Sequence, residues 1–210
     1  MTGGTRTLAE ARGWARTGTR LVLDAVADLD EAGFRAAVVL PGWTRKHLAA
    51  HVAANADALG RLVHWAATGE ETPMYASADE RAAGIARGPD LSADELRDWL
   101  TASSRKLAAG LDGLTEKQWR AQVVTAQGRT VPASELPWMR SREVCVHAVD
   151  LGTGVSFADL PPGFLTALTD EISTGRRLDE LPEGPPPEIA AWLAGRPHTL
   201  VDAPPLGPWL

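Results

Sequence analysis

The stretch from Thr44 to Gly69, TRKHLAAHVAANADALGRLVHWAATG, predicts one long helix. Thr44 is suited to the N-cap position, Pro41-Gly42 breaks the chain before it, and Gly69 ends the pattern. Three- and four-residue spacing places a set of apolar side chains on one inner face, namely Leu48, Val52, Leu59, Leu62 and Ala66. His51 lies between the first two of these in the sequence, so its imidazole is expected on the same inner face.

The same kind of pattern predicts three more long helices. They are expected over Leu8 to Leu29, from Ala93 to about Leu111 with Ser92 as the cap, and up to about Leu151 with Pro137 in the first turn. A short helix is expected near Ala78 to Ala86. The segment from Gln122 to Val131 alternates and contains Gln127-Gly128, which predicts a hairpin. Four long helices favour a bundle.

The composition changes after Gly152, because most of the 15 prolines lie in the C-terminal part of the chain. Helical segments are expected near Gly163 to Thr174 and Pro187 to Leu193, followed by an extended Thr199-Leu200-Val201. We therefore expect a mainly α fold. Residues 1–152 would form the four-helix bundle, and residues 153–210 a small α/β C-terminal subdomain.

Charge and composition exclude several classes of protein. The net charge is −6, and no basic stripe offsets it, so we expect no nucleic-acid partner. No apolar run is long enough to cross a membrane, and Met1 to Arg6 lacks a signal-peptide pattern, so a cytoplasmic location is expected. Cys145 is the only cysteine, which rules out an internal disulfide and a cysteine-based metal site within one chain.

Glu143 and His147 are four residues apart and therefore lie on the same side of their predicted helix. A buried carboxylate must be paired, protonated or bound to a cation. With His51 from another helix, the three side chains form a ligand set with one open position, which is typical of catalytic zinc. The alternative is that His51 packs in the core while Glu143 forms an ion pair with Arg140 or Arg142.

Two neighbouring side chains are not expected to bind the metal. His47 lies one turn before His51 and is interpreted as solvent-facing or as a supporting residue. Cys145 lies two residues from Glu143, about 200° around the helix, so it should face away as a packed thiol.

Several motifs, in order along the chain, resemble the mycothiol-dependent maleylpyruvate isomerase family, a group of DinB-like metal-binding bundles. The resemblance covers about three-quarters of the chain and is weakest from Gly154 to Glu188, which looks shortened. The motifs that carry it are Pro41-Gly42-Trp43-Thr44, His47, His51 to Leu59, Thr68-Gly69, Pro73-Met74-Tyr75, Arg81, Gly128-Arg129, Leu136 to Arg140, Arg142-Glu143, His147 to Leu151, Trp192 to Arg196, Pro204-Pro205-Leu206 and Pro208-Trp209-Leu210.

The resemblance implies an enzyme with a DinB-like four-helix bundle, about one zinc ion per chain held by His51, Glu143 and His147, and mycothiol as the thiol cofactor. It also implies cis-trans isomerisation of maleylpyruvate to fumarylpyruvate, or of a related unsaturated acid. A thiolate would add to the cis-alkene, the resulting single bond would rotate, and elimination would restore the trans-alkene. The Ala-, Arg- and Gly-rich composition fits an actinobacterial source.

Three further residues are predicted to serve the site. A dicarboxylic substrate needs cationic anchors, and the guanidinium fork suits a carboxylate, so Arg81 and Arg196 are the candidate catalytic residues. Each has an alternative interpretation as a solvated or structural arginine. Asn55, one turn after His51, would bind the cofactor or orient the zinc ligands.

Three functions remain open at this point. The first is the thiol-dependent isomerase, the second is a mycothiol S-transferase that conjugates the thiol to an electrophile, and the third is a non-enzymatic zinc-binding regulator. The partners expected are a small-molecule substrate and the thiol cofactor, with no nucleic acid and no membrane. The chain is expected to be a monomer or a homodimer.

Overall fold

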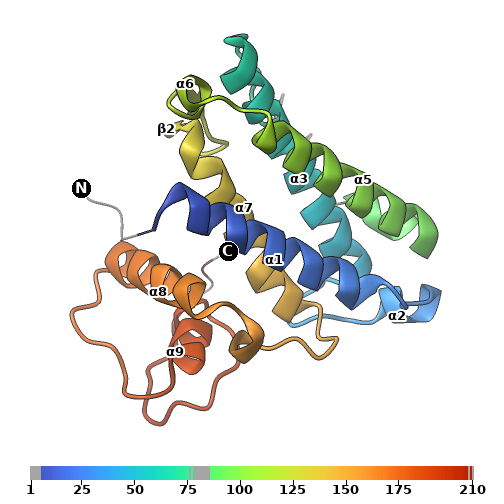
Figure 1. Cartoon of the computed structure of the whole chain (residues 1–210). Helices are drawn as coiled ribbons and strands as arrows, with labels where there is room; N and C mark the ends of the chain where they lie inside the picture. Colours follow the sequence, from blue (N-terminus) through green and yellow to red (C-terminus); the bar gives the residue numbers. More distant parts are fainter. Residues whose placement is uncertain (1–5, 76, 78–85, 208, 210) are drawn as a thin grey trace.

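Four long helices form the body of the molecule in the computed structural model, which describes residues 6–75, 77, 86–207 and 209 (Figure 1). They are α1 (Leu8–Val26), α3 (Arg45–Thr68), α5 (Ala93–Asp112) and α7 (Leu136–Asp150). The mainly α bundle predicted from the sequence is therefore confirmed. The short helix predicted near Ala78 to Ala86 falls almost wholly outside the described residues.

The ends of α3 and α5 follow from their capping residues. The backbone N–H of Thr44 donates to His47 Nδ1 at 3.2 Å, and Gly69 ends α3 with φ +82°. At the start of α5, Ser92 accepts from the Glu95 N–H and donates back to the Glu95 carboxylate. This reciprocal pair is a capping box, so the sequence-based start of this helix is confirmed.

The first helix is shorter than its apolar pattern predicts. It ends at Val26, and a separate helix α2 (Glu31–Arg35) follows. The Asp30 carboxylate accepts from the Gly33 N–H at 2.7 Å and so begins the new helix. Phe34 is fully buried and anchors α2 in the bundle core. The prediction that the helix continues to Leu29 was therefore wrong in its last turn.

The predicted hairpin is present between α5 and α7. Strands β1 (Gln122–Val124) and β2 (Thr130–Pro132) are antiparallel, with Val123 opposite Val131. Gly128 has φ +73°, a conformation that favours glycine in the turn. Among the described residues, the connections between the long helices also contain the short helices η1 (Gly88–Asp90), α6 (Glu116–Trp119) and η2 (Ala133–Glu135).

The C-terminal part contains η3 (Phe157–Asp159), α8 (Pro162–Arg176) and α9 (Pro186–Leu193). No strand occurs among its described residues, so the β component of the predicted α/β subdomain was wrong. Residues Thr199–Val201 have no strand beside them to pair with, because the one sheet of the described structure is β1–β2. Leu200 instead packs against the apolar cluster of α8 and α9.

One apolar cluster joins the C-terminal helices to the bundle. It includes Ala11 of α1, Cys145 and Val146 of α7, Phe164 and Leu168 of α8, and Trp192 of α9. Beside it, Glu171 of α8 accepts hydrogen bonds from the indole of Trp138 and the guanidinium of Arg142, both on α7. Apolar packing and an ion pair thus hold α8 against α7. The domain boundary at residue 152 stays a prediction.

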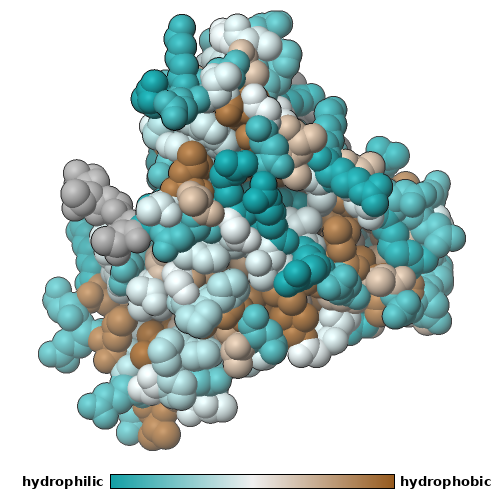
Figure 2. Space-filling model, in the orientation of Figure 1, coloured by the Kyte–Doolittle hydropathy of each residue, from teal (hydrophilic) through white to brown (hydrophobic). Residues whose placement is uncertain are grey.

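A groove of about 300 Å³ separates α1 from α5. Its apolar floor includes Leu107 and Leu111, and α1 contributes Arg12, Arg16 and Arg20 to its lining. This is the face seen in Figure 2, where hydrophilic side chains run across the middle with apolar ones beside them.

Within the described residues, none of the helices combines the length and apolar character that crossing a bilayer requires.

Two glycines of α1 should respond in opposite ways to alanine. A Cβ at Gly18 would lie 2.6 Å from both Cys145 Sγ and Val144 Cγ2, and 2.9 Å from the Cys145 backbone nitrogen, whereas a Cβ at Gly13 would meet nothing within 4 Å. Gly18→Ala should lower the free energy of unfolding by about 1–3 kcal/mol, because α1 and α7 must move apart. Gly13→Ala should raise it by about 0.5–1 kcal/mol through helix propensity.

Urea unfolding of the two variants beside the wild type measures both changes. Equal stability of the two variants would contradict the close approach of α1 to α7 at Gly18.

Candidate metal centre

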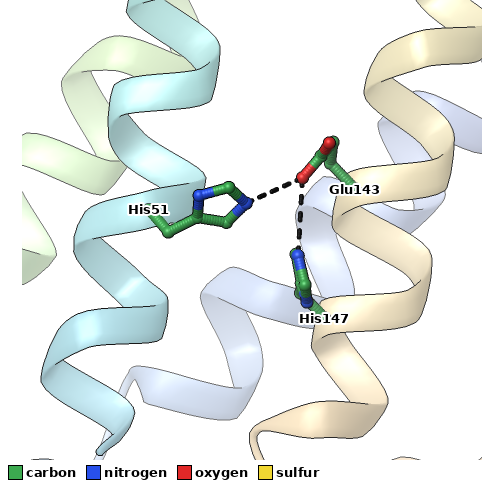
Figure 3. Close-up of side chains that lie close together, drawn as sticks. All are labelled: His51, Glu143 and His147. Atoms are coloured by element: carbon green, nitrogen blue, oxygen red, sulfur yellow. Dashed lines mark hydrogen bonds and ion pairs between the residues drawn. The ribbon is translucent and has the colours of Figure 1, made fainter. Parts of the chain in front are cut away.

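His51 of α3 and the Glu143–His147 pair of α7 meet across the inside of the bundle (Figure 3). One oxygen of Glu143, Oε2, lies 2.9 Å from His51 Nε2 and 3.4 Å from His147 Nε2. The two imidazole rings are 5.0 Å apart and nearly perpendicular. The three side chains can each present one ligand atom within 4.8 Å of the others. The ligand set predicted from the sequence is thus brought together in space.

Hydrogen bonds set the protonation preferences of this group. Burial alone would raise the pKa of Glu143, but the hydrogen bonds from His147 and His51 outweigh it and hold that pKa well below the ordinary value. Burial alone would lower the pKa of His147, but its hydrogen bonds to Asp150 and Glu143 raise it to about 9. The group therefore concentrates a carboxylate and an imidazole that both favour their charged forms.

The arginines that would neutralise Glu143 in the alternative interpretation are engaged elsewhere. Arg142 pairs with Glu171 of α8. Arg140 is 2% exposed and donates to the carbonyl of Val52, to Asn55 Oδ1 and to Ser104 Oγ, so that it links α7 to α3 and α5. Among the described residues, the hydrogen-bond partners of Glu143 are therefore the two histidines.

Asn55 lies beside Arg140 and outside the three-residue ligand group. Its Oδ1 accepts from Arg140 Nη1 at 2.9 Å, and the residue is 7% exposed. The contact with Arg140 therefore orients the Asn55 amide, with Oδ1 toward the guanidinium. The cofactor-binding role given to it from the sequence stays a prediction.

Arg196 is buried and faces Asp150. Its Nε and Nη2 donate to the two carboxylate oxygens at 2.9 and 2.8 Å, and its Nη1 donates to the carbonyl of Ala194. The sequence predicted that this guanidinium fork binds a substrate carboxylate, whereas in the structure the fork is occupied by Asp150. The other predicted anchor, Arg81, lies outside the described residues.

Two side chains next to the ligands occupy other positions, as the sequence analysis expected. His47 Nδ1 accepts from Thr44 at the start of α3, so this imidazole acts as a helix cap. Cys145 is buried on the side of α7 that contacts α1, where its thiol lies 3.7 Å from the carbonyl of Trp14. Burial raises the pKa of this thiol to about 12.

Asp150 is the residue that the sequence analysis missed. It is fully buried, and its Oδ2 accepts from His147 Nδ1 at 2.9 Å. Burial alone would raise its pKa, but the bonds from Arg196 and His147 lower it, so it is a carboxylate at neutral pH. Its position three residues after His147 on the same helix face was the signal that could have identified it.

Comparison with known proteins extends the likeness beyond these residues. A family model described as the mycothiol maleylpyruvate isomerase N-terminal domain matches residues 15–152. The crystal structure of the mycothiol-dependent maleylpyruvate isomerase has 39% sequence identity to the chain, covers 100% of both chains and superposes with a TM-score of 0.91. The chain belongs to this family.

A solved histidine-to-alanine variant of that isomerase gives the same identity, coverage and TM-score. The structural match covers the whole chain, so it extends over residues 154–188, where the resemblance in sequence is weakest. Among curated proteins, the search found no match.

Proposed function

We propose that this chain is a zinc-dependent isomerase that uses mycothiol as its thiol cofactor and acts on maleylpyruvate or a related cis-unsaturated acid. The observation that carries the proposal is the inward-facing His51, Glu143 and His147 group in a chain that belongs to the mycothiol maleylpyruvate isomerase family.

The three side chains fit a zinc ion. Two zinc–ligand bonds of about 2.0–2.1 Å at a tetrahedral angle hold their ligand atoms about 3.3 Å apart. The distances from Glu143 Oε2 to the two imidazole nitrogens, 2.9 and 3.4 Å, are close to this value. Two nitrogens and one carboxylate leave a fourth position for an exogenous ligand, as in catalytic zinc sites.

Bound zinc supplies the Lewis acidity that ionises a coordinated thiol at neutral pH. The chain itself holds the ligands in place and shields them from solvent. The side chains of His51, Glu143 and His147 are 11%, 19% and 5% exposed. The ring of Trp43 packs edge-on against that of His51, with centroids 5.6 Å apart, and limits the rotation of this ligand.

The reacting thiol has to come from outside the chain. Cys145 is the only cysteine, it is buried, and a pKa of about 12 keeps its thiol protonated. A low-molecular-weight thiol such as mycothiol meets this requirement. The cytoplasmic location and the monomeric or homodimeric state expected from the sequence stay predictions.

The decisive experiment incubates zinc-loaded protein with maleylpyruvate, with and without mycothiol, and follows the product by mass spectrometry and absorbance. We expect a product of unchanged mass, formed only when the thiol is present, because the thiol adds and is then released. Cys145→Ser should retain the activity. A stable adduct of thiol and substrate would indicate the S-transferase instead. A zinc-loaded protein that gives neither product would contradict the proposal.

A further inference from the structure

A buried chain of three side chains runs from the C-terminal part of the molecule to a metal ligand. The Arg196 guanidinium donates two hydrogen bonds to Asp150, and Asp150 Oδ2 lies 2.9 Å from His147 Nδ1. The side chains of Arg196, Asp150 and His147 are 4%, 0% and 5% exposed. These contacts therefore persist with little competition from water.

The end of α9 fixes the direction of Arg196. Gly195 has φ +69°, its N–H donates to the carbonyl of Trp192, and the N–H of Arg196 donates to the carbonyl of Ala191. These two hydrogen bonds form a Schellman motif, which reverses the chain direction after a helix. The Gly195-Arg196 sequence thus combines a helix stop with a guanidinium held beside α7.

The contact to Asp150 decides which nitrogen of His147 faces the ligand group. A carboxylate that accepts from Nδ1–H holds the proton on that nitrogen, so Nε2 is the nitrogen that coordinates once a metal ion displaces its proton. In the structure, Nε2 is indeed the atom on the side of Glu143, at 3.4 Å. Arg196 in turn keeps both oxygens of Asp150 in place, because a buried carboxylate without a partner is strongly unfavourable.

We propose that Arg196 and Asp150 are positioning residues for His147, so that the C-terminal segment governs how tightly the bundle binds its metal. This inference rests on the metal site of the proposed function. It replaces the substrate-anchoring role expected of Arg196, since the guanidinium acts through Asp150 on a ligand. Arg196, which is far from the ligands in the sequence, then contributes to metal affinity through Asp150.

The test measures the affinity of the full chain for Zn²⁺ by competition with a chromogenic chelator. Asp150→Asn and Arg196→Ala should each weaken binding by roughly 10–100-fold, the usual effect of removing a partner that orients a ligand. Arg196→Lys should recover part of the affinity, because lysine keeps the charge but loses the two-pronged contact. The absorption spectrum of the Co²⁺-loaded variants should also change, since it reports ligand geometry.

Glu171→Gln is the matched control. It also weakens an ion pair between α7 and the C-terminal part, but Glu171 contacts Arg142 and Trp138 and no metal ligand. The free energy of unfolding of the Glu171→Gln variant should fall, while its Zn²⁺ affinity stays unchanged. If Arg196→Ala fails to fold, Asp150→Asn and Arg196→Lys decide the question.

Wild-type affinity and an unchanged Co²⁺ spectrum in folded Asp150→Asn would overturn the positioning role, as would an equal loss of affinity in the control. Failure of the wild type itself to bind Zn²⁺ would instead overturn the proposed function.

Discussion

Alanine in place of His147 should reduce the zinc content of the purified protein from about one ion per chain to almost none, because two remaining ligands hold zinc poorly. His51→Ala should have the same effect, since its Nε2 lies on the other side of Glu143 Oε2. Isomerase activity should fall to the background rate in both variants. Metal analysis and the mycothiol-dependent assay measure the two effects.

His64→Ala is the matched control for these variants. His64 lies on α3 like His51, but its side chain is 52% exposed and outside the ligand group. We expect full zinc content and full activity. Full zinc retention by the His51 and His147 variants would refute the assignment of the ligands.

Arg140→Ala should lower the free energy of unfolding by about 3–5 kcal/mol, the range for breaking a buried charged network and leaving a cavity. The guanidinium serves three acceptors on two other helices, and its removal leaves the carbonyl of Val52, the amide oxygen of Asn55 and the hydroxyl of Ser104 without this donor. Urea unfolding followed by circular dichroism measures the loss.

Arg140→Met separates the two contributions to this loss. Burial lowers the pKa of Arg140 to about 10, because removal from water disfavours the charged guanidinium. Methionine fills much of the space and removes the charge, so it should destabilise the protein less than alanine does. A loss below about 1 kcal/mol in Arg140→Ala would show that the three hydrogen bonds contribute little to stability.

The helices that begin and end at strong local signals were predictable from the sequence. Thr44 and Gly69 delimit α3, and Ser92 begins α5. Each of these residues acts on backbone N–H or C=O groups within one turn of the helix end, so its effect can be read from the local sequence. The hairpin followed in the same way from the glycine at position 128. In each case the deciding interactions lie between residues close together in the sequence.

The two wrong predictions about the fold, the end of the first helix and the C-terminal strand, depend on contacts that the local sequence pattern does not specify. The apolar spacing continues through Leu29, but the Asp30 cap starts a new helix that places Phe34 in the core. Thr199–Val201 has the composition of a strand, yet no second strand lies beside it. Whether an extended segment becomes part of a sheet depends on its neighbours in space, which spacing along the chain cannot give.

Spacing suggested the metal group, because two of its members share one helix face and the third lies on the inner face of another helix, and the family resemblance then favoured it over the structural alternative. The role of Arg196 was not accessible. Its identity and family-like context pointed to a substrate, whereas its direction is set by the Schellman motif and by a partner 46 positions earlier in the chain. Sequence thus located the important side chains more reliably than it assigned their partners.

The order of these residues along the chain bears on protein synthesis. His51, Glu143 and His147 all leave the ribosome before Arg196, so a nascent bundle presents the three predicted metal ligands while Asp150 still lacks its cation. A chain released or cleaved between α7 and α9 would keep the ligands but lose this support. We expect such a fragment to hold zinc less firmly than the full chain does.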